Sequence, residues 1–125
     1  MILDTNALSA FFDGDDALKR LISNRGNLYL PVVVLGEYRF GLLHSRERKK
    51  REPGLEAFIS ACQILLIDTG TVQPYAEIRS ELKMSGKPMP SNDVWIAALA
   101  RQHNLPVVTR DSHFSHVSAI QRLVW

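Results

Sequence analysis

Four acidic residues stand at positions where an α/β fold could carry out chemistry. Asp4 follows the apolar residues that open the chain, and Asp111 follows the apolar run in "LPVVTRD". Asp93 lies in "SNDVWIAALA", where Ser91 would cap a helix, and Glu37 lies in a mostly apolar stretch. Each acid alone could be a helix cap, a turn residue or an exposed side chain. Carboxylates gathered in one crevice repel one another, so a cluster of four indicates a bound cation.

The residue types restrict which cation this would be. Carboxylate oxygens are the ligands that Mg²⁺ and Mn²⁺ prefer. No set of Cys and His residues has the spacing of a zinc site. We expect His113 and His116 to be solvated or at the edge of the core rather than metal ligands.

Short apolar runs alternate with longer helical patterns, which predicts a parallel sheet covered on both faces. Right-handed crossovers make this an open, doubly wound sheet, whose ligand crevice lies beyond the carboxyl ends of the strands. Asp4 and Asp111 would both lie there. Strands are expected in residues 1–4, 27–31, 63–67, 105–111 and 120–125, and helices in 7–24 with a break at 13–16, 32–45, 55–62, 72–84 and 91–103.

Length and composition indicate a single globular domain over residues 1–125. The sequence is 46% hydrophobic and 22% charged, which suffices for a core of its own. Its one cysteine, Cys62, excludes an internal disulfide and is expected to be a buried, inert thiol. No apolar run reaches membrane-spanning length and no leader is evident, so we expect a soluble cytoplasmic protein with no membrane partner.

The charge distribution holds one basic cluster. The net charge is only +2, but "RERKKR" sets five cations around Glu47. Such a run is either a solvated helix junction or a phosphate-binding patch. We expect Pro53 and Gly54 to separate it from the following helix. The candidate RNA-binding residues of this run are Arg46, Arg48, Lys49, Lys50 and Arg51.

Taken together, these motifs resemble the PIN-domain ribonucleases, and within them the VapC toxins of toxin–antitoxin pairs. The resemblance covers nearly the whole chain and rests on "ILDTNALS", the "GE" pair ending in Glu37, "PSNDVWIAALA" and "VVTRDSHF". It implies a three-layer α/β/α sandwich around a short, mostly parallel sheet. It places the four acids on the family's catalytic and metal-binding site, and it makes Thr5, Asn6, Asn92 and Thr109 supporting polar groups.

The resemblance also implies an activity and partners. The expected activity is Mg²⁺- or Mn²⁺-dependent endoribonuclease cleavage, leaving a 5′-phosphate and a 3′-hydroxyl. The substrate would be tRNA or another structured RNA. The chain would form a homodimer and bind a cognate VapB-like antitoxin, whose peptide would cross the acidic crevice with an Arg or Lys among the carboxylates. The apolar helix containing "VLGEYRFGLL" would offer it a groove.

Three other functions fit parts of the sequence. "LLIDTGT", with Asp68, resembles the active-site turn of an aspartic protease, but the following residues have helical spacing, which favours a strand end and helix cap. A phosphoacceptor role for Asp4 lacks a second acid two residues on, where Asn6 stands. A PIN scaffold that binds RNA without cleaving it is the third alternative.

Overall fold

Five short parallel strands form the centre of the molecule in the computed structural model, which describes residues 1–125. The strands are β1 (Ile2–Leu3), β2 (Tyr29–Pro31), β3 (Gln63–Leu65), β4 (Val107–Val108) and β5 (Arg122–Leu123), and their order in the sheet is β3-β2-β1-β4-β5. In the register of the central strands, Ile2 lies opposite both Tyr29 and Val107. All pairs are parallel, which confirms the predicted sheet.

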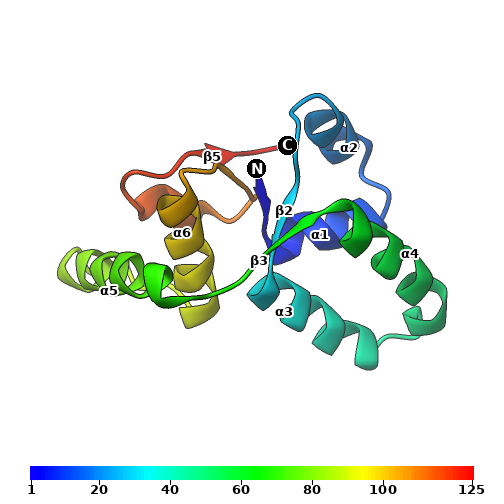
Figure 1. Ribbon diagram of the computed structural model, residues 1–125, viewed down its shortest axis with the longest axis horizontal. Coiled ribbons are helices and arrows are strands. Elements are labelled where there is room, and N and C mark those ends of the chain that lie inside the picture. The colour runs from blue at the N-terminus through cyan, green and yellow to red at the C-terminus, as the bar shows by residue number, and fades with distance from the viewer.

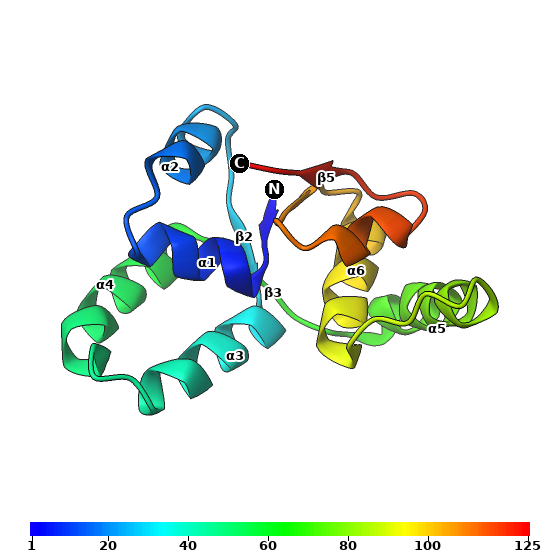
Figure 2. The same cartoon turned by 180° about the vertical axis from the view of Figure 1, so that it is seen from behind.

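Helices cover both faces of this sheet (Figures 1 and 2). One group lies on one side and contains α1 (Thr5–Phe12), α2 (Asp16–Ser23), α3 (Val32–Leu43) and α4 (Arg48–Ala61). On the other side lie α5 (Thr69–Met84), α6 (Ser91–His103) and the 3₁₀ helix η1 (Ser112–His116). Right-handed connections require this division, because the chain moves one way across the sheet from β1 to β3 and the other way from β3 to β5. The predicted three layers are therefore confirmed.

The sheet reverses its direction of winding between β1 and β4. The chain leaves β1 for α1 on one face and leaves β4 for η1 on the other. Loops that part in this way open a crevice at the carboxyl ends of the two strands, which is where open α/β sheets bind ligands. Asp4 is the first residue after β1, and Asp111 follows β4 after two residues.

The core packs against these central strands. Ile2, Leu3, Val107 and Val108 have no exposed surface, as expected for strands buried on both faces. Helix α6 supplies a long buried run from Ile96 to Ala100. Cys62 was expected to be buried but is only half-buried; burial raises its pKa to about 11, which keeps the thiol protonated at neutral pH. None of the helices is long and apolar enough to span a bilayer.

The structure corrects what was predicted for the starts of four helices, the first of which, α1, begins at Thr5 rather than Ala7. Pro53 and Gly54 do not separate the basic run from the next helix, because α4 begins at Arg48 and continues through both. Proline can adopt the helical φ, and the carbonyl that it leaves without a donor, that of exposed Lys49, is open to water. Helix α5 begins at Thr69 rather than Val72, because Asp68 caps it. The bounds of α6 are as predicted, but Ser91 is its first residue rather than its cap, and the capping position belongs to Pro90, whose side chain can accept no hydrogen bond.

Candidate active site

A cavity of about 400 Å³ lies at the carboxyl ends of β1 and β4. It brings together all four acids that the sequence singled out, which come from the end of β1, helix α3, the start of α6 and the loop after β4. Its lining residues are Asp4, Thr5, Asn6, Glu37, Phe40, Pro90, Asp93 and Asp111. Phe40 and Pro90 were not predicted, and Phe40 keeps 67% of its surface exposed beside the acids.

Asp4 is the most buried of these acids, with 3% of its surface exposed. One of its oxygens accepts a hydrogen bond of 2.7 Å from the Ala7 N–H, so Asp4 caps α1. Burial is the main cause that raises the pKa of Asp4, and neighbouring Asp111 raises it further, while the Thr109 hydroxyl and the Ala7 N–H oppose that rise. The cap and the site are thus the same residue, and the cap fixes the carboxylate at the floor of the cavity.

Glu37 is held by two of the predicted supporting groups. The Thr5 hydroxyl donates to one Glu37 oxygen at 2.5 Å, and the Asn92 amide donates to the other at 2.5 Å. Because both oxygens accept hydrogen bonds, the carboxylate cannot rotate freely, although the glutamate side chain is long and flexible. Asn6 lines the cavity, and its side chain makes no hydrogen bond to an acid.

Asp93 lies in the first turn of α6, half-buried in the cavity wall. Burial raises the pKa of Asp93 to about 6, with further rises from Asp111, Glu37 and Asp4 in that order. The helix N-terminus favours an anion here, but burial and three neighbouring acids outweigh it. The pKa of Asp93 is therefore raised by repulsion from the other three acids as well as by burial.

Asp111 is positioned by residues before and after it. Its N–H donates to the hydroxyl of fully buried Thr109 at 2.9 Å, so the predicted supporting role of Thr109 rests on a contact. Asp111 also caps η1 by accepting from the His113 N–H at 2.9 Å, and the Nδ1 atom of His113 lies 2.7 Å from the same oxygen. This role of His113 was not predicted; the signal for it was the Asp-Ser-His order, in which the side chain of an aspartate can accept from the N–H two residues on.

These acids have no Lys or Arg partner. The contact between Asp111 and His113, which is an ion pair only when the imidazole is protonated, is the only such contact made by any of the four. As the side chains stand, no three acidic, His or Cys groups are close enough to form a metal shell. The donor chemistry nevertheless fits a hard divalent cation, because several ionised oxygens share one cavity and nothing else neutralises them.

No residue of the basic run lines the acidic cavity. It occupies the α3–α4 connection and the start of α4, and most of its side chains are exposed. Arg48 pairs with Glu52 at 2.8 Å, Lys50 with Glu47 at 3.8 Å and Arg51 with Asp13 at 2.8 Å. A second cavity of about 250 Å³ shares Thr5 and Glu37 with the acidic cavity and extends to Arg51. Of the five cations, only Arg51 thus reaches a cavity that adjoins the acids.

The "DTG" turn is structural in this fold. Asp68 accepts from the Gly70 N–H at 2.9 Å, and the Thr71 hydroxyl accepts from the Asp68 N–H at 3.1 Å, which forms a capping box for α5. The sheet is parallel and helix-covered, whereas the aspartic proteases are all-β. The helix-cap interpretation of Asp68 is confirmed.

Comparisons with known proteins match this architecture over nearly the whole chain. The model of the PIN domain family matches residues 1–120. Ribonuclease VapC5 of Mycobacterium tuberculosis is 33% identical over 91% of this chain and 84% of its own length. The tRNA(fMet)-specific endonuclease VapC of Shigella flexneri is 28% identical over 86% of this chain and 82% of its own. A crystal structure of VapBC-5 from Mycobacterium tuberculosis, a member of the VapBC family of toxin–antitoxin systems, has a TM-score of 0.76 and 32% identity and covers 98% of this chain and 94% of its own.

Proposed function

This chain belongs to the PIN-domain family, and from that membership we propose that it is an endoribonuclease, the toxin of a toxin–antitoxin pair, which cleaves RNA in the acidic cavity. The observation that carries the proposal is the cavity itself. Four carboxylates from separate elements meet there without a Lys or Arg partner, at the crevice where open α/β sheets bind ligands.

A divalent cation, Mg²⁺ or Mn²⁺, belongs to this proposal. Asp4, Asp93 and Asp111 would hold it, with Glu37 beside them. When bound, the cation would lower the pKa of the attacking water and neutralise charge on the phosphodiester. The raised pKa of Asp93 supports the assignment: burial is its main cause, and the neighbouring acids, which no Lys or Arg of the protein compensates, raise it further.

The remaining chemistry falls to residues whose positions are fixed by their contacts. Glu37, held by Thr5 and Asn92, would orient the water that attacks phosphorus. The bond to the 3′-oxygen breaks, and the proton from the water passes to that oxygen, so the products are a 5′-phosphate and a 3′-hydroxyl. Thr109 and His113 would keep Asp111 turned toward the cavity.

The substrate in this proposal is tRNA or another structured RNA. A relative from Shigella flexneri, named as a tRNA(fMet)-specific endonuclease, supports tRNA as the first RNA to test. The four acids cannot distinguish bases, so selectivity would come from the surrounding residues. The basic run could grip phosphates at a distance from the cleavage point, with Arg51 nearest to the acids.

The proposed protein partners are an antitoxin and a second copy of the chain. The similarity to VapBC-5 supports a VapB-like antitoxin. A peptide of that antitoxin would place an Arg or Lys among the carboxylates, where a charge-assisted contact replaces the missing counter-charge. The homodimer would use the exposed apolar face of α3 that carries Val32, Phe40 and Leu43, which leaves the antitoxin the rest of the helix that was first expected to offer it a groove. RNA and antitoxin would both meet the protein in the cytoplasm.

The decisive experiment is cleavage of total RNA by the purified protein, followed by mapping of the new ends. We expect cleavage with Mg²⁺ or Mn²⁺, none with EDTA, and none with Asp93→Asn. The control variant is Asp16→Asn, which removes an exposed aspartate on α2. Cleavage that persists in EDTA would contradict the metal-dependent nuclease. RNA binding without cleavage under every metal condition would favour the non-catalytic alternative.

A further inference from the structure

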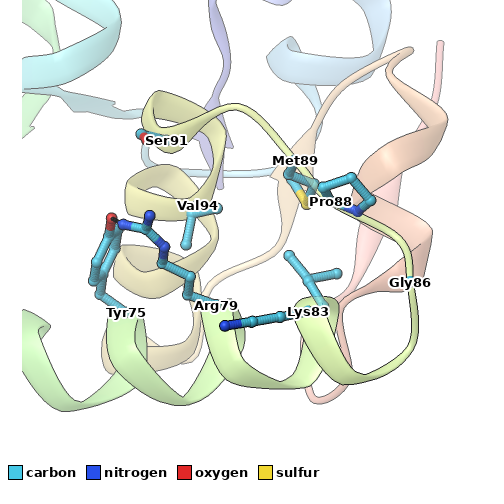
Figure 3. A pocket seen from close by; sticks show the side chains of 9 residues that line it. Tyr75, Arg79, Lys83, Gly86, Pro88, Met89, Ser91 and Val94 are labelled. Carbon is cyan, nitrogen blue, oxygen red and sulfur yellow. Dashed lines mark hydrogen bonds between the residues drawn. The ribbon is translucent and has the colours of Figure 1, made fainter.

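The largest cavity of the molecule, about 510 Å³, is separate from the acidic one and lies between α5, α6 and the loop that joins them (Figure 3). Arg79 and Lys83 reach it from α5, and Val94 from α6, while Met89 and Pro88 come from the loop (Figure 3). Its size is typical of a pocket for a small ligand or one unit of a polymer.

The two cations of this cavity have no acidic partner. Neither Arg79 nor Lys83 forms an ion pair, and no acid lines the cavity. The acids of α5 are engaged elsewhere: Glu77 accepts from Gln73 at 2.9 Å, and Glu81 pairs with Arg101 at 3.1 Å. The cavity is therefore positively charged, the opposite of the acidic cavity.

The walls of this cavity combine fixed cations with an apolar floor, which fits a nucleotide. Arg79 donates a hydrogen bond of 2.7 Å to the Tyr75 hydroxyl, which holds the guanidinium at the cavity edge. The Tyr75 ring is itself fixed by stacking on Trp95, with 3.7 Å between ring centroids. Leu82 and Val94 are buried apolar residues that line the floor. Cations beside an apolar floor suit a phosphate joined to a sugar and base.

The two cavities adjoin through a short segment of chain. Pro90 lines the acidic cavity, while its neighbours Met89 and Ser91 line the basic one. An extended strand that leaves the acids over Pro90 would therefore arrive directly between Arg79 and Lys83. A flexible polyanion can bind across an acidic and a basic cavity more readily than a folded protein surface can, because each of its phosphates can take its own position.

We propose that the cavity between α5 and α6 is a subsite for single-stranded RNA, in which Arg79 and Lys83 bind a phosphate next to the cleaved one and the apolar floor contacts its sugar and base. This proposal rests on the proposed ribonuclease function. It extends the RNA contact to the face of the sheet opposite the basic run, so that the strand would pass across the acidic cavity from one set of helices to the other.

The test compares Arg79→Gln/Lys83→Gln with the charge-matched control Arg20→Gln/Arg25→Gln, which removes two exposed, unpaired cations near α2. RNA binding is measured in EDTA against salt concentration, with a single-stranded oligonucleotide that contains the mapped cleavage site. We expect the dissociation constant of the first variant to rise about tenfold, and its salt slope to fall by roughly 0.7 per lost contact. The control should bind as wild type does.

A second measurement locates the subsite on the RNA. The oligonucleotide is shortened one nucleotide at a time, from each end in turn. We expect shortening from one end, and not from the other, to lower the affinity of wild type to that of the double variant. Equal salt slopes for variant and wild type, on RNA that wild type binds and cleaves, would overturn the subsite and leave the nuclease intact. Loss of dimer or antitoxin binding with unchanged RNA affinity would assign the cavity to a protein partner and overturn it too. If wild type binds and cleaves no RNA, the proposed function itself fails.

Discussion

At the scale of single residues, Asp4 combines two roles that usually belong to different side chains. It caps α1 through the Ala7 N–H and supplies the most buried carboxylate of the cavity. Asparagine keeps a side-chain oxygen for the cap but carries no charge. Asp4→Asn should therefore lower the cleavage rate by about 10²–10³-fold, the loss typical when one preorganised charge is removed. Its melting temperature without metal should equal or exceed that of wild type.

Kinetics on a mapped RNA substrate and thermal unfolding in EDTA measure both effects, with Asp16→Asn as the control. Full activity in Asp4→Asn would remove Asp4 from the chemistry. A clear loss of stability would indicate that the cap depends on the aspartate rather than on any side-chain oxygen.

Asp93 makes stability depend on pH in a direction opposite to that of an acid whose pKa is lowered on folding by an ion pair. Its pKa is raised to about 6 in the folded protein, above the usual 3.8. Between these values the folded state binds more protons than the unfolded state, so stability falls as pH rises through this window. Asp93→Asn removes the effect. Without metal, its gain in unfolding free energy over wild type should grow from pH 4 to pH 7.5 by about 1 kcal/mol, since the group is only half-buried and solvent screens it.

Denaturant titrations at several pH values in EDTA test this prediction. A difference between Asp93→Asn and wild type that stays constant or shrinks with rising pH would contradict it. Adding Mg²⁺ or Mn²⁺ should narrow the difference, because a cation that binds the native carboxylates stabilises wild type more than the variant.

The positions of the site acids could be predicted from the sequence because they are determined by the ends of strands and the starts of helices. Asp4 and Asp111 each come just after a short apolar strand, and parallel strands end at the same edge. The contacts between side chains could not be predicted, because they join distant segments. Asn92 and Glu37 are 55 residues apart, and only the packing of α3 beside α6 brings them together. The role of His113 depends on the geometry of a local turn, which is set by the residues that pack around the turn.

At the scale of elements, α4 shows how local rules can mislead. Pro53 and Gly54 both disfavour helix interiors, yet the helix passes through them because Leu55 and Phe58 bury against the core. Packing of this kind outweighs local propensity. The consequence for function is that Arg48, Lys49, Lys50 and Arg51 lie within α4, whereas Arg46 lies in the connection before it.

The helical part of the basic run gives a prediction for RNA binding. Replacing Arg48, Lys49 and Lys50 with Ala should weaken RNA binding and lower its salt slope by about 0.7 to 1 per lost phosphate contact. Lys49 forms no ion pair, whereas Arg48 and Lys50 must first leave Glu52 and Glu47. The Michaelis constant should therefore rise more than the turnover number falls.

Glu37→Gln should give the opposite pattern, with turnover falling while binding survives. The control for the triple variant is Lys19→Ala/Arg20→Ala/Arg25→Ala, which removes the same charge from another surface. An unchanged salt slope in the triple variant would mean that the run is only a solvated charged surface.

At the scale of the whole molecule, one face of α3 remains without a partner. Val32, Gly36, Phe40 and Leu43 recur at the spacing of a single helix face, and Phe40 and Leu43 expose 67% and 57% of their surface. Nothing lies within 4 Å of a Cβ built on Gly36, so another backbone could approach closely there. Because Phe40 also lines the acidic cavity, a second copy packed on this face would bring two acidic cavities near each other.

The homodimer prediction follows from that face. Leu43→Glu would place a charge in the middle of the apolar contact, which costs several kcal/mol unless the charge is paired. We expect wild type to sediment as a dimer at micromolar concentration and Leu43→Glu as a folded monomer. The matched control is Met84→Glu, because Met84 is 86% exposed at the end of α5 and lies off the α3 face. A monomeric wild type would contradict the homodimer itself. A dimer that survives Leu43→Glu but not Met84→Glu would place the interface away from α3, and would remove the reason for two acidic cavities to face one RNA.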